Sequence, residues 1–193
     1  NLDTFAQNLR DTQPTVFFAV PRIWTKFYLG VIAKIPAPKL NFMLSNPAMA
    51  EKVKQQIKGS LGLSKVAVAA TGSAITPAYL KDFYKKLDIH LVEAYGMTET
   101  CGGITNTPNL DALQDSVGKA RPFAEVKIHP ETAEVLKDSW MYSGDKGTID
   151  ENGYLRIVGR VKDAFKTSKG SYITPNPLEK ILETTIQYCK DRT

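Results

Sequence analysis

Three short apolar segments, separated by longer segments with helical periodicity, constrain the fold of this chain more than any other feature. "PTVFFAVP" (14–21), "KVAVAATGSA" (65–74) and "IHLVEAYG" (89–96) are rich in small, β-branched and aromatic residues and predict buried strands. Between the first two, "RIWTKFYLGVIAKI" and "NPAMAEKVKQQIKGSLGL" space their apolar residues as amphipathic helices do. This order predicts an α/β fold with a mainly parallel sheet.

Small and polar residues follow two of these predicted strands at the point where each strand ends. The stretch "ATGSA" closes the second strand, and "EAYGMTET" closes the third. After "ATGSA", Thr76 is placed to cap a helix over "TPAYLKDFYKKL", with Pro77 as the first helical residue. Because open α/β sheets bind ligands beyond the carboxyl ends of their strands, both stretches are candidate ligand contacts.

The character of the sequence changes after about residue 117. "AEVKI", "SWMYSGDKGTID" and "GYLRIVGR" alternate in polarity and predict short strands, and "DENG" predicts a hairpin turn between the last two. A charged connector and an amphipathic helix, "PLEKILETTIQY", follow. We expect a domain boundary near Arg160–Lys162, which gives two regions, residues 1–160 and 161–193.

Composition and charge narrow the class of protein. The 193 residues carry a net charge of +5 that is spread along the chain, which suits small anionic ligands better than a nucleic acid. The two cysteines lie far apart without metal-ligand spacing, which favours a reducing, cytoplasmic setting. No apolar run has the length of a membrane span. The polar N-terminus lacks an initiator Met, so we expect the chain to start inside a longer protein.

The loop "YGMTET" has the residue types of a phosphate and metal site. Gly96 lets the backbone approach a ligand closely, and the hydroxyls of Thr98 and Thr100 can donate to phosphate oxygens. The carboxylate of Glu99 can hold Mg²⁺, and the ring of Tyr95 can stack on a nucleobase. A polar loop with a capping threonine explains the same residues equally well.

Two further stretches allow both a functional and a structural interpretation. The turn at "TGSA" could line the same pocket or could only precede a helix. Asp145, in "YSGD", could accept the two hydroxyls of a ribose, or could belong to an ordinary strand-end turn. In "GRVKDAFK", Arg160 could complete a ribose or phosphate site, whereas Lys162 and Asp163 fit a solvated charge run. His90 and His129 have no catalytic partner in the sequence, which favours structural roles.

The order of these stretches is more specific than any one of them. "TGSAITPAYLKDF", "IHLVEAYGMTET", "SVGKARP" and "YSGDKGTIDENGYLRIVGRVKDAFKTSKGSYITPNPLE" together closely resemble the adenylate-forming (AMP-binding) enzyme superfamily, over nearly the whole chain. "TQPTVFFAVPRIWTKF" resembles its long-chain acyl-CoA synthetase branch. The resemblance implies the C-terminal half of a large α/β domain, a small β-rich region and the start of a mobile C-terminal domain.

The resemblance also implies a reaction and its substrates. Family members convert a carboxylic acid and ATP to an acyl-adenylate and pyrophosphate, and a thiol, here coenzyme A, then displaces AMP. The substrates would be a fatty acid, ATP and coenzyme A, with Mg²⁺ as the metal ion and no nucleic acid as partner. We expect a cytoplasmic enzyme, with room for peripheral membrane contact because fatty acids partition into lipid.

By the same resemblance, each candidate residue takes a role. Thr98 would contact phosphate, Glu99 would hold Mg²⁺, Asp145 would bind the ribose hydroxyls with Arg160 beside it, and Lys162 would lie at the hinge. The remaining residues would form the walls of the nucleotide site, with Tyr95 stacked on the base: Gly72, Ser73 and Ala74 on one side, and Glu93, Ala94, Tyr95 and Gly96 on the other.

Three departures from the family pattern lead to a narrower expectation. The glycine- and threonine-rich phosphate loop of the family would lie before Asn1, and its C-terminal lysine would lie after Thr193. The stretch "VKIHPETAEVL" is shorter than in the family, so we expect residues to be missing near 128–131. The 193-residue chain alone should therefore be inactive, and the activity should belong to a full-length parent.

Two alternatives to an acyl-CoA synthetase remain open at this point. The first is another adenylate-former that activates an aryl or amino acid. The second is a non-catalytic nucleotide-binding or interaction module, which the missing phosphate loop and lysine would favour.

Overall fold

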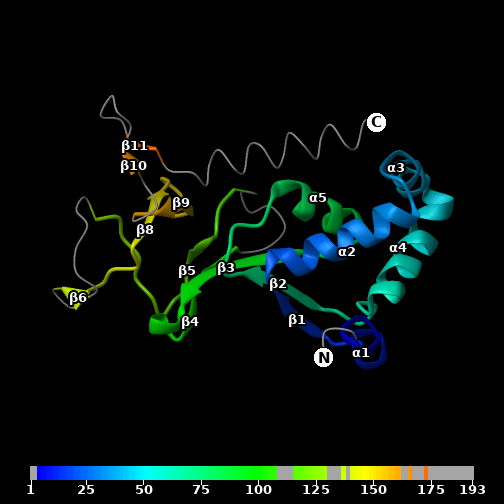
Figure 1. The fold of residues 1–193 in the computed structure, drawn as a ribbon, viewed down its shortest axis with the longest axis horizontal. Helices are drawn as coiled ribbons and strands as arrows, with labels where there is room; N and C mark the ends of the chain where they lie inside the picture. The colour runs from blue at the N-terminus through cyan, green and yellow to red at the C-terminus, as the bar shows by residue number, and fades with distance from the viewer. Residues whose placement is uncertain are drawn as a thin grey trace. The chain divides into compact units, whose positions relative to one another are not determined.

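The structure is a computed structural model that describes residues 4–107, 115–129, 136–137, 140–161, 165–166 and 172–173. It divides into two compact units, one up to Glu93 and the other beginning at Ala94. The strand order of the largest sheet is β1-β2-β3-β4-β5 (Figure 1). Its third strand, β3 (Leu91–Met97), starts in the first unit and ends in the second.

The first unit contains helices and parallel strands. Its elements are α1 (Phe5–Thr12), β1 (Val16–Ala19), α2 (Pro21–Lys34), α3 (Ala37–Ser45), α4 (Pro47–Leu61), β2 (Val68–Gly72), α5 (Ala78–Lys86) and the start of β3. Strands β1 and β2 pair in parallel, with Val16 opposite Val68. The three predicted strands and the two predicted helices between the first pair are confirmed, and so is the mixed α/β class.

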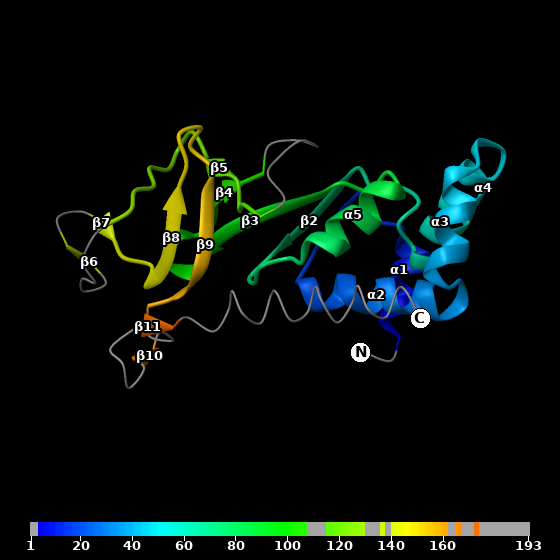
Figure 2. The same cartoon turned by 90° about the horizontal axis from the view of Figure 1, so that it is seen from above.

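Helices α2 and α5 lie side by side (Figure 2). They share an aromatic core with β1. The indole N–H of Trp24 donates to the carbonyl of Ala19 at 3.1 Å, and the hydroxyl of Tyr84 donates to the carbonyl of Trp24 at 2.7 Å. The two rings meet edge to face with centroids 4.9 Å apart, a favourable arrangement for buried aromatic pairs. These contacts fix α5, and with it the loop that connects β2 to α5.

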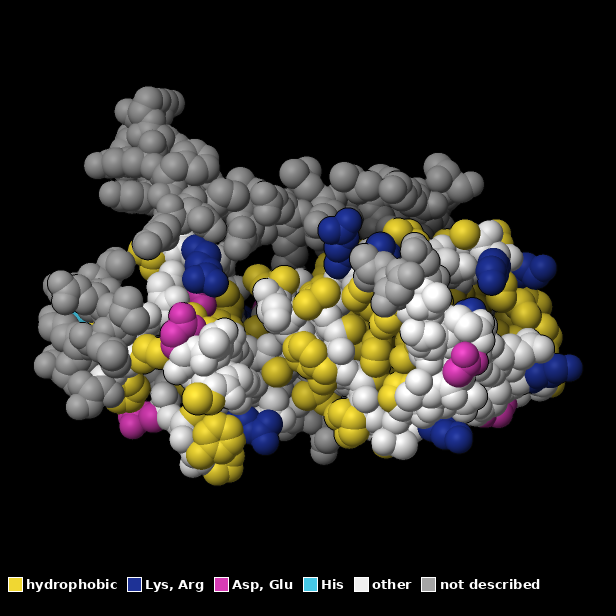
Figure 3. All heavy atoms as spheres, turned by 60° about the horizontal axis from the view of Figure 1, so that its bottom comes forward, with side chains coloured by type: hydrophobic (Ala, Val, Ile, Leu, Met, Phe, Trp, Pro, Cys, Tyr) yellow, Lys and Arg dark blue, Asp and Glu magenta, His cyan; other side chains and the backbone are white. Residues whose placement is uncertain are grey.

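The two faces of the β1–β2 pair differ in exposure. Ala19 and Ala69 are buried in the core, whereas Val16, Phe18 and Val68 are exposed, with 56% of Phe18 accessible. Successive side chains of a strand point to opposite faces, so the exposed residues share one face of the pair. Figure 3 shows that hydrophobic side chains also reach the surface elsewhere, among scattered lysines and arginines.

The starts of two helices next to prolines, α3 and α5, differ from the prediction. Pro36 separates α2 from an additional helix, α3, because proline is tolerated in the first turn, where its missing N–H is not needed. Helix α5 begins at Ala78, one residue later than predicted, and Pro77 is its N-cap. Thr76 does not cap this helix: its hydroxyl lies 3.0 Å from the hydroxyl of Thr71.

The second unit is built from antiparallel strands. Its elements are the end of β3, the 3₁₀ turn η1 (Thr98–Thr100), β4 (Gly102–Asn106), β5 (Lys119–Ala120), β6 (Leu136–Lys137), β7 (Trp140–Met141), β8 (Asp145–Ile149), β9 (Leu155–Arg160), β10 (Phe165–Lys166) and β11 (Tyr172–Ile173). Strand β4 pairs with both β3 and β5, and β8 pairs with β9. The predicted hairpin around "DENG" is thus confirmed.

Three other expectations fall on or next to residues outside the described ranges. These are the role of Lys162, the C-terminal helix from "PLEKILETTIQY", and the residues expected to be missing near 128–131. The expected boundary near Arg160–Lys162 also stays a prediction. Among the described helices, none combines the length and apolarity that a membrane span requires.

Candidate functional site

Three of the predicted site residues, Tyr95, Asp145 and Arg160, meet in the second unit. The hydroxyl of Tyr95 donates to Oδ2 of Asp145 at 2.7 Å, and Nε of Arg160 lies 3.0 Å from Oδ1 of the same carboxylate. Asp145 and Arg160 are directly opposite each other in the β8–β9 pair, so the strand register itself brings the two charges together. The carboxylate is only 9% exposed, whereas the Arg160 side chain is 59% exposed.

The surroundings of Tyr95 keep its hydroxyl protonated. Partial burial raises its pKa from 10.0 to about 12, because the ionised phenolate would be poorly solvated there. A hydrogen bond with Ser143 lowers the pKa and the neighbouring carboxylate of Asp145 raises it, so burial decides the direction. The Ser143 hydroxyl also accepts from the Asp145 backbone N–H at 3.2 Å. Tyr95 is therefore a stable hydrogen-bond donor to Asp145.

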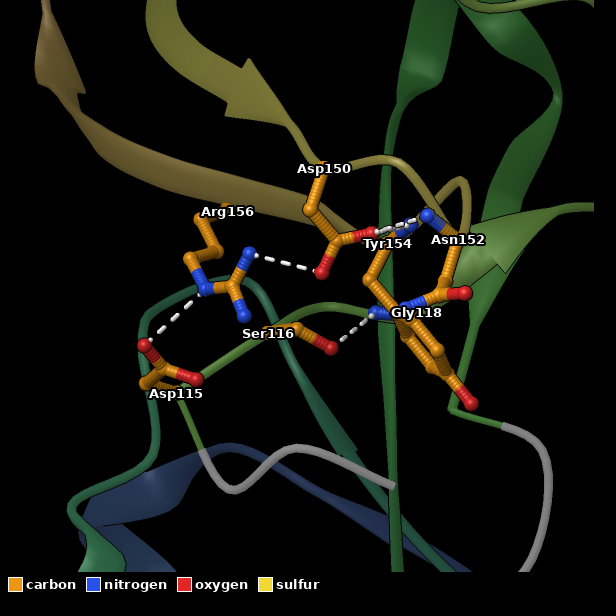
Figure 4. Close-up of polar contacts among 7 residues, drawn as sticks. All are labelled: Asp115, Ser116, Gly118, Asp150, Asn152, Tyr154 and Arg156. Carbon is orange, nitrogen blue, oxygen red and sulfur yellow. Dashed lines mark hydrogen bonds and ion pairs between the residues drawn. The ribbon is translucent and has the colours of Figure 1, made fainter.

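An ion-pair cluster fixes the other end of the β8–β9 hairpin (Figure 4). The guanidinium of Arg156 bridges two carboxylates, with Nε 3.0 Å from Asp115 and Nη1 3.0 Å from Asp150. Hydrogen bonds from the backbone of Tyr154 and Asn152 lower the pKa of Asp150, with help from Arg156. The turn of the hairpin is therefore held in one conformation by its own first residue.

Backbone hydrogen bonds join this hairpin to the segment that leads into β5. Val117 N–H donates to the carbonyl of Leu155 at 2.9 Å, and Leu155 N–H donates to the carbonyl of Gly118 at 2.8 Å. The hydroxyl of Thr105 in β4 donates to the carbonyl of Val117 at 2.7 Å. Since β4 pairs with β3, these bonds connect the hairpin that carries Asp145 to the strand that carries Tyr95.

The predicted phosphate and metal loop is a tight turn held by Thr100. Its hydroxyl accepts from the Met97 N–H at 3.0 Å and lies within reach of the carbonyls of Met97 and Gly102. A side chain at Gly96 would collide with the backbone of Gly102, so only glycine allows this approach. Thr100 is thus engaged within the loop, although the sequence analysis offered its hydroxyl as a phosphate donor.

Thr98 and Glu99 project from this loop. Both are exposed, and neither side chain has a hydrogen-bond or ion-pair partner among the described residues. No cluster of three or more metal-ligating side chains occurs in the described part of the chain. In proteins, Mg²⁺ commonly binds through one or two carboxylates together with waters and substrate phosphates. A lone exposed carboxylate beside a threonine hydroxyl is compatible with such a site.

The other predicted wall residues lie in two segments, the end of β2 with the loop that follows it, and strand β3. Gly72 is buried, whereas Ser73 and Ala74 are exposed. Ser73 has a φ of 68°, in the left-handed region that is unfavourable for a residue with a Cβ. The side chain of Glu93 is buried: Oε1 accepts from the Thr76 N–H at 2.8 Å, and Oε2 forms an ion pair with Lys81. Ala94 and Gly96 are half-buried in β3.

Sequence reasoning missed several residues that hold these groups in place, namely Lys81, Thr71, Thr76, Ser143 and Arg156. The contacts of Thr76 with Glu93 and of Arg156 with Asp115 join positions 17 and 41 residues apart, which no local pattern identifies. Thr71 and Ser143 contact Thr76 and Asp145 within a few residues, but nothing in the sequence marks those contacts. Lys81 offered the only signal, because it stands on α5 close to the buried Leu80 and Phe83. A lysine in such a position needs an anionic partner.

Comparison with known proteins gives one family for this chain. The family model described as AMP-binding enzyme matches residues 1–150. The long-chain-fatty-acid–CoA ligase heimdall of Drosophila melanogaster is 29% identical over 233 residues, an alignment that covers 93% of this chain and 34% of the ligase. The chain therefore spans about a third of the length of the curated relatives it matches.

Two solved structures share the fold of this chain. O-succinylbenzoate coenzyme A synthetase from Bacillus subtilis, in complex with ATP and magnesium, matches with a TM-score of 0.65 and 17% identity, over 94% of this chain and 39% of that one. The A-PCP didomain of a carboxylic acid reductase from Segniliparus rugosus, in complex with AMP, matches with a TM-score of 0.67 and 24% identity, over 93% and 28% of the two chains. At these identities the likeness concerns the fold.

Proposed function

The chain belongs to the AMP-binding enzyme family, and on that premise we propose that its full-length parent activates a fatty acid with ATP and transfers the acyl group to coenzyme A. In the first half-reaction, a carboxylate oxygen of the acid attacks the α-phosphorus of ATP and pyrophosphate leaves. In the second, the thiolate of coenzyme A attacks the acyl carbonyl and AMP leaves.

The cluster of Tyr95, Asp145 and Arg160 is the observation that carries this proposal. Its three members come from two distant stretches of sequence, and each has the chemistry that a nucleoside monophosphate requires. The Tyr95 ring offers a stacking surface for the base, and Asp145 can accept the two ribose hydroxyls. The exposed guanidinium of Arg160 can turn toward a phosphate or ribose oxygen while the Tyr95 hydroxyl still holds the carboxylate.

Thr98 and Glu99 are assigned to the phosphate end of the nucleotide. Glu99 would hold Mg²⁺, which when bound neutralises phosphate charge and orients the leaving pyrophosphate. Thr98 can donate its hydroxyl to a phosphate oxygen, and Thr100 keeps the turn closed so that both neighbours stay exposed. Neither residue needs to rearrange before the nucleotide binds.

The remaining wall of the site is assigned to two backbone segments. We assign Gly72, Ser73 and Ala74 to the adenine side and the start of the acyl pocket, and we assign Ala94, Tyr95 and Gly96 to base contacts. Small residues at these positions allow the backbone to approach a flat base. Lys162 is proposed as the hinge that lets the C-terminal domain rotate between the two half-reactions.

The choice of a fatty acid rests on the relatives. The Drosophila ligase and the Arabidopsis thaliana long chain acyl-CoA synthetase 2, which is 27% identical over 224 residues, carry that activity in their names. The synthetase structure with ATP and magnesium supports those two ligands for this fold. We extend the proposal to a cytoplasmic enzyme that meets fatty acids at membrane surfaces, where these acids accumulate.

The test is pyrophosphate exchange into ATP by the full-length protein, with a panel of saturated and unsaturated fatty acids. We expect exchange that depends on both a fatty acid and Mg²⁺, and acyl-CoA formation once coenzyme A is added. Pyrophosphate exchange only with aryl or amino acids would show that the substrate belongs to one of those classes and is not a fatty acid. No exchange with any acid, together with retained AMP binding, would replace the enzyme by a nucleotide-binding module.

A further inference from the structure

A buried ion pair joins three elements around the loop between β2 and α5. Glu93 of β3 is 3% exposed and Lys81 of α5 is 12% exposed, and Oε2 of the glutamate pairs with the ammonium group. Oε1 accepts the backbone N–H of Thr76 at 2.8 Å. The Thr76 hydroxyl in turn lies 3.0 Å from that of Thr71, at the end of β2, and both threonines are fully buried.

This network holds both ends of a strained loop. Thr71 precedes the turn formed by Gly72, Ser73 and Ala74, and Thr76 follows it. Ser73 adopts the left-handed backbone region, which is unfavourable for a residue with a Cβ and persists only where the surroundings enforce it. The network is the enforcing structure, because it anchors the loop to β3 and α5 at once.

Stability alone would not require charged residues in this network. Burying two charges carries a large desolvation penalty, and apolar residues of similar volume often stabilise a fold as well or better. A charged pair, in contrast, works only in one geometry, since both carboxylate oxygens need their partners in fixed places. Such a pair defines the conformation of the loop between them.

We infer that Glu93 is a positioning residue that sets the Gly72–Ala74 turn through Lys81 and Thr76, and that its carboxylate does not contact the ligand. The resulting effect on nucleotide use rests on the proposed function. The effect on the loop itself does not, because it follows from contacts within the first unit. Lys81, which lies within the stretch "TGSAITPAYLKDF", thereby gains a role that the sequence analysis did not assign to it.

Amide hydrogen exchange on the full-length protein tests the loop directly. We expect Glu93→Gln, which leaves an acceptor for Thr76 but no charge for Lys81, and Lys81→Met to speed exchange in the peptide containing Thr76 by about tenfold each. Lys54→Met is the matched control, since it removes the more exposed ion pair with Asp88 from the same unit. Unchanged exchange at Thr76 in both test variants would overturn the inference.

Steady-state kinetics of the same variants separate positioning from direct contact. If Glu93 acts through the loop, Glu93→Gln and Lys81→Met each raise the KM for ATP about tenfold, and the double variant is no worse than either one. If Glu93 touches the nucleotide, Lys81→Met leaves this KM unchanged and the inference fails. A wild-type protein without pyrophosphate exchange activity would refute the proposed function. The amide hydrogen exchange result would still decide whether Glu93 positions the loop.

Discussion

Glu93 and Asp145 are two carboxylates with the same kinds of partners and different accessibility. Each accepts a hydrogen bond from a neutral donor and pairs with a cation: Thr76 N–H and Lys81 for Glu93, the Tyr95 hydroxyl and Arg160 for Asp145. Lys81 is 12% exposed, whereas Arg160 is 59% exposed. The exposure of the cation, rather than of the carboxylate, distinguishes the two sites.

This difference separates a structural carboxylate from one that can exchange its partners. Around Glu93, no incoming ligand can replace Lys81 without opening the packing of α5. Around Asp145, the solvated Arg160 can leave and return at little cost, because exposed ion pairs contribute little net free energy. The same pattern of contacts therefore fixes a loop in the first unit and leaves a carboxylate available in the second.

The largest expected effect concerns protein stability, and it tests the difference between Glu93 and Asp145. Glu93→Ala should lower the free energy of unfolding by about 3–5 kcal/mol, because it removes the buried carboxylate that pairs with the Lys81 ammonium and accepts from the Thr76 N–H. Asp145→Ala should cost less, about 1–3 kcal/mol, since solvent can reach Arg160. Urea denaturation of the full-length variants measures both. Equal losses would show that exposure of the cation does not decide the energetics.

The next effect concerns Glu99, whose carboxylate has no hydrogen-bond or ion-pair partner among the described residues. Glu99→Ala should lower kcat/KM for Mg-ATP by about 100-fold, because several kcal/mol of charge stabilisation depend on the metal ion. Binding of the fatty acid should change far less. Initial rates at varied Mg-ATP, with fatty acid binding measured by calorimetry, test the pair of claims. Equal losses in kcat/KM for Mg-ATP and in fatty acid affinity would contradict the metal role of Glu99. Glu51→Ala on α4 serves as the control.

The third prediction concerns the effect of Asp145→Ala on the use of ATP. Asp145→Ala should raise the KM for ATP about 10- to 100-fold, which corresponds to the loss of charge-assisted hydrogen bonds worth about 1.5–3 kcal/mol. The KM for the fatty acid should stay near the wild-type value. Asp150→Ala, at the other end of the same hairpin, is the matched control. An unchanged ATP requirement would remove Asp145 from the ribose site.

The smallest effect concerns the Tyr95 hydroxyl. Tyr95→Phe keeps the ring and removes one hydrogen bond, so the KM for ATP should rise only about fivefold, for a bond worth about 1 kcal/mol. The raised pKa adds a dependence on pH: the unfolded chain loses this proton near pH 10, the folded chain near 12, so stability falls as pH rises through that window. Tyr95→Phe should lose this part of the alkaline sensitivity in thermal unfolding measured from pH 9 to 12.

The sequence predicts the elements of this fold better than the partners of its side chains. The strands at 14–21 and 65–74 were predictable because apolar runs and flanking prolines are local signals. Motifs predict Tyr95, Asp145 and Arg160 as site residues; the β8–β9 register pairs Asp145 with Arg160, and a side-chain hydrogen bond adds Tyr95. The partners of Glu93 were not predictable, because a strand pattern indicates which residues are buried and not which helix faces them. For the same reason the sequence predicts Thr76 as a helix cap, whereas in the structure its hydroxyl contacts Thr71.

The exposed face of β1 and β2 has a consequence for handling the protein. In the described part of the chain β1 is the first strand of the sheet order, and Val16, Phe18 and Val68 lie bare on one side of the pair. An edge strand with apolar side chains is a template for pairing with another chain. At high concentration the 193-residue segment alone is therefore expected to aggregate, which light scattering would detect.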